Sequence, residues 1–251
     1  MNAFTEMWAW LTDVNNWSGS AGIPTRVLEH LEISAVAVIA AIVIALPLGL
    51  YIGHARKAEF VTINLANLGR AFPSFAVLAI AFPIALQFDL GFSIVPIVVA
   101  LFLLGIPLIL LNTYAGVKGV DPDTVEAARG MGMSEAKILG SIELRLAAPV
   151  IVAGIRTSAV QVVATATLGA VVAGGGLGRY IVDGFAQQND GMLLGGALLV
   201  ALLAMATELA LGLVQRATQP RTRSREGTRH PQGRSPSVFV GPTRAEDSVS
   251  G

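Results

Sequence analysis

The chain has no cysteine and only three histidines among its 251 residues. Without cysteine it can form no disulfide, thiol nucleophile or thiolate metal site. The histidines, His30, His54 and His230, are scattered, and none is paired at the spacing of metal ligands. We therefore expect this chain to hold no metal and no cofactor.

Charged side chains are also scarce. They make up 14% of the residues, against about 25% in soluble domains. The 17 basic and 17 acidic residues balance to zero, which argues against a nucleic-acid-binding protein, because such proteins carry a basic face. Hydrophobic residues make up 53% of the chain, and long windows carry no charge at all. This composition is typical of an integral membrane protein.

Five windows are long and apolar enough to cross a membrane, which takes roughly 20 mostly apolar residues. In hydrocarbon the backbone polar groups must bond to one another, so each window is expected to form a helix. The predicted fold class is all-α, a polytopic membrane protein with about five transmembrane helices. The windows are Leu31–Gly53, Phe60–Leu86, Phe92–Leu111, Ala148–Ala173 and Met192–Val214.

Two glycine pairs in these windows, Gly49 with Gly53 and Gly191 with Gly195, have the small-xxx-small spacing that lets helices approach closely. The spacing is common, so a helix contact and a chance occurrence both stay open.

Lys and Arg are enriched in the segments that follow the first, third and fifth windows, whereas the other segments hold only Arg26 and Arg179. Positive charge favours the cytoplasmic side of a membrane. The pattern therefore predicts a protein of the bacterial plasma membrane with its N-terminus outside and its C-terminus in the cytoplasm.

Three regions are expected on this basis. Residues 1–26 form an external or interfacial segment without the features of a cleavable signal peptide. Its tryptophans favour the outer membrane interface, and a loosely ordered tail is the alternative. Residues 27–217 form the transmembrane domain. Residues 218–251 form a disordered, Arg-rich cytoplasmic tail, either solvated or in contact with lipid headgroups.

The loop between the third and fourth windows, residues 118–147, carries the signals of two short helices. Asp121 is a favourable N-cap, Pro122 suits the first helical position, and Asp123 suits the helix dipole. Gly130 and Gly132 are expected to end this helix near Arg129, and Ser134 can cap a second one that continues to about Leu146. A plain linker needs neither the caps nor the glycine corner, so the loop is interpreted as a docking surface.

Within this loop, Glu126-Ala127-Ala128, three residues, Gly132, nine residues and Ile142-x-Leu144 resemble the EAA loop of permease subunits of bacterial ABC importers. The resemblance extends over about residues 24–215. The family usually has proline after Ile-x-Leu, whereas Arg145 stands there. Without that proline the second helix is expected to run on towards the fourth window, with Pro149 as the later break.

The resemblance implies the type I permease core of an ABC importer. The loop would be the coupling helix that sits in a groove of the ATP-hydrolysing subunit. Further partners implied are a second permease, identical or a sister chain, an extracytoplasmic substrate-binding protein and membrane lipid. The residues carried over to the coupling role are Glu126, Ala127, Ala128, Gly132, Ser134, Ile142 and Leu144. Replacing Gly132 with Asp is expected to stop transport while the protein still inserts.

The run from Glu126 to Met133 looks most like permeases for osmoprotectants such as glycine betaine, choline and proline-type compounds. Several other segments are similar to the same group. Methionine and taurine or sulfonate importers share much of the pattern, so these substrates stay open. Two other classes are weighed, an ion-coupled secondary transporter and a non-transporting scaffold, but neither accounts for the capped helix pair.

The chain is not expected to be an enzyme. A P-loop requires Gly-x-x-x-x-Gly-Lys-Ser/Thr, and none of Lys57, Lys118 and Lys137 stands in that pattern. ATP and its magnesium ion are therefore assigned to the partner subunit. The glycine-rich run Gly174–Gly178 lacks the lysine, and we interpret it as a tight turn where glycine permits positive φ.

Three ionisable residues, Arg70, Arg156 and Glu208, lie within the windows, where charge is expensive to bury. We hypothesise that Glu208 pairs with Arg156 or Arg70 between helices and helps to hold one conformation of the gate. The alternative is that each side chain snorkels to the interface.

The substrate path has weaker candidates: Phe72, Pro73, Ser74, Phe75, Thr165 and Thr167. Quaternary ammonium ligands are held by aromatic faces, and the windows are poor in aromatic residues. We therefore expect a low-affinity passage, with the binding protein supplying affinity. The alternative for Phe72 and Phe75 is that they face lipid or pack in the core.

Overall fold

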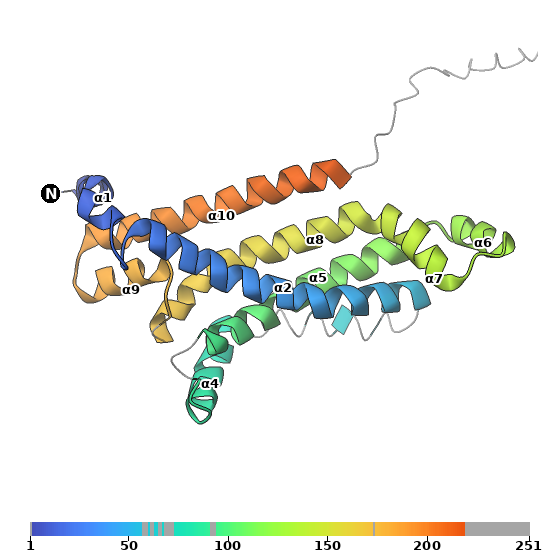
Figure 1. Ribbon diagram of the computed structural model, residues 1–251, viewed down its shortest axis with the longest axis horizontal. Helices are drawn as coiled ribbons and strands as arrows, with labels where there is room; N and C mark the ends of the chain where they lie inside the picture. Colours follow the sequence, from blue (N-terminus) through green and yellow to red (C-terminus); the bar gives the residue numbers. More distant parts are fainter. Residues whose placement is uncertain are drawn as a thin grey trace, which may run out of the picture. The chain divides into compact units, whose positions relative to one another are not determined.

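The computed structural model describes residues 2–56, 60, 63, 64, 67, 73–90, 94–172 and 174–218. Every regular element in these residues is helical (Figure 1). The α-helices are α1 (Ala3–Thr12), α2 (Ile23–Ala55), α4 (Ser74–Leu86), α5 (Val95–Lys118), α6 (Pro122–Gly130), α7 (Glu135–Ile138), α8 (Leu144–Thr165), α9 (Gly178–Ala186) and α10 (Asp190–Thr218). Two 3₁₀ segments, Val14–Trp17 and Ala166–Val172, and one π-helical segment, Leu139–Glu143, complete the list.

Within the residues that the structure describes, four helical stretches are long and apolar enough to cross a membrane. They are α2, α5, α10 and the run Glu135–Val172, which joins α7, the π segment, α8 and the second 3₁₀ segment. They confirm four of the five predicted windows. Of the remaining window, Phe60–Leu86, the C-terminal half forms the 13-residue apolar helix α4, while most of its first half lies outside the described residues.

The helices extend beyond the predicted windows at their ends. α2 begins at Ile23 rather than Leu31, so the expected boundary between residues 26 and 27 falls inside a helix. The polar residues in its first turns are tolerated because they have partners. Arg26 Nη1 lies 2.8 Å from Glu29 Oε2, and the ring of His30, which is buried, lies 2.8 Å from the Val163 carbonyl oxygen on α8.

Both glycine pairs mark close helix contacts. A Cβ atom at Gly49 would lie 2.7 Å from Thr113 Cβ, and one at Gly53 would lie 2.8 Å from Val117 Cβ. Real Cβ atoms do not approach so closely, so α2 and α5 meet here only because both positions lack a side chain. The hypothesis of a chance occurrence is therefore wrong for this pair.

The N-terminal segment is helical, and the structure does not support the loosely ordered alternative. α1 packs on the N-terminal half of α10, where a Cβ atom at Gly195 would lie 2.5 Å from the Trp10 ring and one at Gly191 would lie 2.6 Å from the Glu6 carbonyl oxygen. Trp10 also meets Tyr180 of α9 edge-on, with ring centroids 4.9 Å apart. The second glycine pair thus holds α1 in place.

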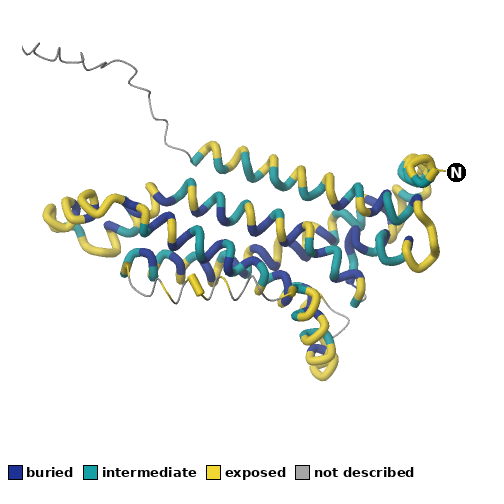
Figure 2. Tube along the Cα trace, turned by 180° about the vertical axis from the view of Figure 1, so that it is seen from behind, coloured by how far each residue is buried: buried dark blue, intermediate teal, exposed yellow. Residues whose placement is uncertain are grey.

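The burial of α10 decreases along its length, from its N-terminal to its C-terminal half (Figure 2). Its buried residues, Gly191, Gly195, Gly196 and Val200, all lie in the half that contacts α1 and α9. Further along, Leu202, Met205, Leu209 and Leu213 are half or more exposed. A membrane helix can present such a face to lipid or to another chain.

Candidate functional site

The loop between α5 and α8 is folded on a small core of its own. The Asp121 carboxylate accepts a hydrogen bond from the Asp123 backbone N–H at 3.0 Å, and Pro122 occupies the first turn, as the sequence predicts for the start of α6. The apolar side chains beneath α6 are Val120, Val125, Ala128 and Ile138, with Met133 and Ile142 packed against them.

The corner after α6 is a Schellman motif centred on Gly132. Gly132 has φ of +79°, its N–H donates to the Arg129 carbonyl oxygen at 2.9 Å, and the Met133 N–H donates to the Ala128 carbonyl oxygen at 3.1 Å. These two bonds close the helix end, and the positive φ between them favours glycine. The predicted glycine corner therefore lies at Gly132, while Gly130 is the last residue of α6.

The loop lies at one end of the helical unit and presents α6 outward (Figures 1 and 2). Glu126 and Ala127 are exposed, whereas Ala128 is buried against the loop core. Met131 is 75% exposed at the tip of the corner. Of the three residues of the Glu-Ala-Ala run, two are thus accessible on the outer face of α6 and one anchors the helix.

The second helix of the loop is continuous with the fourth predicted window. Ser134 occupies the N-cap of α7, but its side chain makes no capping hydrogen bond. The helix then runs through the π segment into α8, as expected from Arg145 in place of proline. Pro149 lies inside α8 and does not break it, because a single missing N–H is tolerated in a membrane helix. Ile142 is half-buried and Leu144 is exposed.

Sequence reasoning did not identify the residues that attach this loop to α2. His54, in the last turn of α2, contacts both Glu135 and Glu143, and Glu135 also pairs with Arg129 across the glycine corner. This carboxylate raises the pKa of Arg129 above its usual value by hydrogen bonding. The residue in the sequence that could have indicated this attachment is Glu143, an acidic residue shortly before the apolar window Ala148–Ala173.

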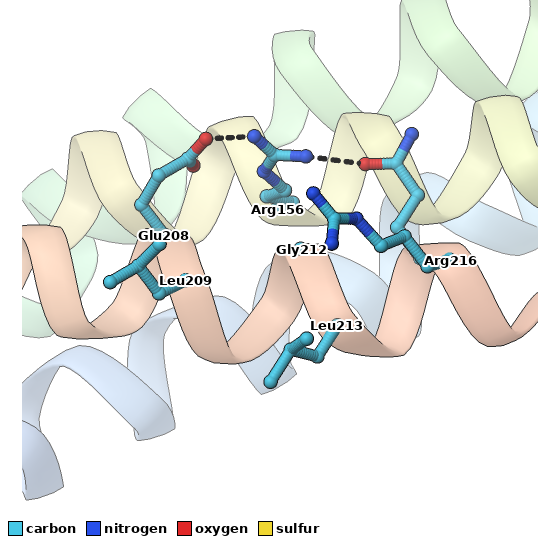
Figure 3. Close-up of a pocket in the computed structure, with 7 residues that line it drawn as sticks. Arg156, Glu208, Leu209, Gly212, Leu213 and Arg216 are labelled. Carbon is cyan, nitrogen blue, oxygen red and sulfur yellow. Dashed lines mark hydrogen bonds and ion pairs between the residues drawn. The ribbon is translucent and has the colours of Figure 1, made fainter.

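Arg156 and Glu208 form an ion pair between α8 and α10 (Figure 3). Arg156 Nη1 also donates to Gln215 Oε1 at 2.7 Å. The pair lines an open cavity of about 440 Å³ together with Leu209, Gly212, Leu213 and Arg216. The structure thus brings together one of the two pairings hypothesised from the sequence, whereas Arg70 lies outside the described residues. A role of the pair in a gate stays a prediction.

Two of the candidate path residues that the structure describes share a cavity. Ser74 and Thr165 line the same small apolar cavity between α4, α5 and α8. Pro73 is the N-cap of α4, and Phe75 on that helix is 50% exposed. Thr167 donates its hydroxyl to the Ala164 carbonyl oxygen at 3.0 Å and does not line this cavity. Phe72 lies outside the described residues.

The run Gly174–Gly178 is a tight turn, as predicted. Gly176 has φ of +84°, and its N–H donates to Glu29 Oε2 at 2.8 Å. A Cβ atom at Gly178 would lie 2.4 Å from the Thr167 carbonyl oxygen. A carboxylate from α2 thus already occupies the donor that a phosphate would need, which agrees with a structural turn rather than a nucleotide site.

Comparison with known proteins places these features in context. The sequence profile of the family described as "Binding-protein-dependent transport system inner membrane component" matches residues 41–224. The choline transport system permease protein OpuBB of Bacillus subtilis is 38% identical over 195 residues, which cover 78% of this chain and 88% of that protein. The glycine betaine/carnitine/choline transport system permease protein OpuCB of the same organism is 38% identical over 193 residues, covering 77% and 87%.

A solved structure shares the fold. A chain of the MetNI methionine ABC transporter, solved in inward facing conformations, is similar with a TM-score of 0.69 at 21% identity. The similarity covers 77% of this chain and 94% of that chain.

Proposed function

Because this chain belongs to the family of binding-protein-dependent transport system inner membrane components, we propose that it is the permease subunit of an ABC importer for osmoprotectants such as choline, glycine betaine and carnitine. The observation that carries the proposal is the identity of 38% to two such permeases over more than three quarters of the chain. The matched region includes the docking loop, with its exposed α6 and glycine corner.

The proposed importer consists of several chains with separate roles. A separate subunit binds ATP and magnesium and docks on α6, so this chain binds neither and catalyses no reaction. An extracytoplasmic protein delivers the substrate, and a second permease, identical or a sister chain, completes the pathway. The end of the unit that carries α6 faces the cytoplasm, with the N-terminus outside. The excess of Lys and Arg in the segments at that end supports this orientation.

Uptake of labelled glycine betaine at high osmolarity tests the proposal. The host lacks its own osmoprotectant carriers and expresses this chain with its ATPase and binding protein. We expect ATP-dependent uptake that choline and carnitine block by competition. Uptake of methionine or taurine in place of betaine would keep the importer and reject the substrate class.

A matched control separates ATP-driven from ion-driven transport. The partner ATPase is expressed with its P-loop lysine replaced, so that the complex can assemble but not hydrolyse ATP. We expect uptake to disappear. Uptake that survives this change and collapses with an ionophore would instead indicate a secondary transporter.

A further inference from the structure

The C-terminal end of α2 is attached to the docking loop at two points. Arg56, which caps α2 with φ of +49°, donates from Nη2 to the Val120 carbonyl oxygen, just before α6, at 3.0 Å. His54, two residues earlier, lies between two carboxylates on the far side of the loop. The first membrane-spanning helix therefore holds the loop both before α6 and after it.

The His54 ring contacts a carboxylate through each of its nitrogens. Nδ1 lies 2.5 Å from Glu143 Oε2, and Nε2 lies 3.1 Å from Glu135 Oε2. The Glu143 side chain is only 1% exposed, and that of Glu135 is 54% exposed. An ionised carboxylate accepts hydrogen bonds, so a ring nitrogen that carries a hydrogen can donate to the carboxylate that faces it.

The π segment Leu139–Glu143 explains how both carboxylates reach one ring. Eight residues of regular α-helix turn through about 800°, which would set Glu143 about 80° around the axis from Glu135. A π segment closes its hydrogen bonds over five residues instead of four, so it turns less per residue and reduces this offset. The Leu144 N–H donates to the Leu139 carbonyl oxygen in this manner. Glu135 and Glu143 thereby share the face that meets His54.

Glu135 extends the contacts across the corner to α6. Its Oε1 accepts from Arg129 Nε at 2.7 Å and its Oε2 from Arg129 Nη2 at 3.0 Å, a two-point geometry that fixes orientation as well as distance. An unbroken chain of contacts thus runs from Arg129 on α6 through Glu135 to His54 on α2. From there it reaches α5, because Gly53 lies directly against Val117.

We propose that His54 is a positioning residue for coupling, which passes the displacement of α6 to α2 through Glu135 and Glu143. The inference rests on the proposed function, since it assumes that an ATPase moves α6. If the contacts are severed, α6 still docks through its own exposed face, but its movement is transmitted poorly to the membrane-spanning helices. The expected signature is ATP hydrolysis that continues while transport falls.

The test measures ATP hydrolysis and betaine uptake in the same vesicles, which contain the full complex with its ATPase and binding protein. The variants are His54→Gln at the centre of the contacts and Glu135→Ala at their exposed end. Glu135→Ala leaves the buried pair of His54 and Glu143 intact, so it tests the proposal even if His54→Gln fails to insert. For each, we expect the uptake per ATP hydrolysed to fall by about fivefold or more, in the range of typical couplings between sites.

The matched control removes an ion pair that lies away from the loop. Arg179 and Asp183 on α9 are paired at 2.9 Å, and Asp183→Asn is expected to leave the ratio unchanged. An unchanged ratio in an assembled Glu135→Ala complex overturns the proposal. Loss of the ATPase from the Glu135→Ala complex also overturns the proposal, because Glu135 would then be needed for docking of the ATPase rather than for passing the movement of α6 to α2. Failure of the proposed function is seen separately, as absence of ATP-dependent uptake by the unsubstituted complex.

Discussion

Gly130 and Gly132 are two residues apart in the docking loop, and their backbone conformations differ. Gly132 has φ of +79° between the two hydrogen bonds of the Schellman motif, whereas Gly130 ends α6 without a positive φ. Beyond the adjoining residues and the backbone of the helix itself, neither has an atom within 4 Å of the place where a Cβ would stand. Space is therefore equal at the two positions, and only backbone strain distinguishes them.

This difference gives a prediction at the residue scale. A positive φ costs an ordinary L-residue about 1–2 kcal/mol, and a β-branched residue is a clear outlier there. We expect Gly132→Val to distort the corner and lower uptake by about tenfold, which corresponds to 1.4 kcal/mol. Gly130→Val is the control and is expected to stay within about twofold of the unsubstituted protein, as surface changes usually do.

Uptake is measured at equal amounts of inserted protein. Equal losses in the two variants would show that added bulk, and not the left-handed corner, disturbs the loop.

Among the helices, α8 and α10 are joined by a polar link. The half of α10 beyond Val200 has no buried residue, so apolar packing within the described part of the chain holds it weakly. Arg156 bridges Glu208 and Gln215 across the two helices (Figure 3). The bridge is half-exposed in a cavity rather than buried. The strength of the ion pair therefore depends on whether water or hydrocarbon fills that cavity.

A double-mutant cycle tests this link between elements. Glu208→Gln and Arg156→Gln each leave one charge without its partner, so each is expected to lower the thermal midpoint and the uptake. The double variant is expected to lose less than the sum of the two. Arg216→Gln is the matched control, because Arg216 lines the same cavity and makes no ion pair with a described residue. Unaltered assembly, stability and uptake in Glu208→Gln would reject the pairing as a functional element.

For the whole molecule, the two ends of the helical unit differ in what they expose. One end carries α6 and the corner, with Met131 75% exposed, and the other carries α9, with Phe185 78% exposed. One candidate span, Glu135–Val172, lies between the two residues, so they would lie on opposite sides of a membrane, with Met131 in the cytoplasm and Phe185 outside. The N-terminus would then lie on the outer side, where α1 meets α10.

The absence of cysteine makes this orientation testable without background labelling. We expect an impermeant maleimide to label Phe185→Cys in spheroplasts and Met131→Cys only in inside-out vesicles. Addition of the partner ATPase should protect Met131→Cys and leave Phe185→Cys unchanged. The reverse labelling would overturn the proposed orientation, and labelling of both positions from one side would contradict the membrane crossing by Glu135–Val172 between them.

The candidate site was predictable from sequence where the signal is local. The cap at Asp121, the corner at Gly132 and the turn at Gly174–Gly178 each depend on one residue type that the backbone conformation favours. Helix ends were less predictable. Arg26 and Glu29 stabilise the N-terminal extension of α2 by pairing with each other, and Glu29 also accepts a hydrogen bond from the Gly176 N–H. A hydropathy profile does not predict such contacts.

The sequence by itself determined the all-α membrane architecture, the first capped helix of the loop between α5 and α8, and the family, because apolar length, capping residues and a spaced motif act within short segments of chain. Only the tertiary structure decided which charges meet. Arg156 and Glu208 are separated by 52 residues and His54 and Glu143 by 89, and their contacts depend on how whole helices pack and on one π segment that rotates Glu143 towards α2. Helix rotation and register are collective properties of the packed bundle, and no local pattern specifies them.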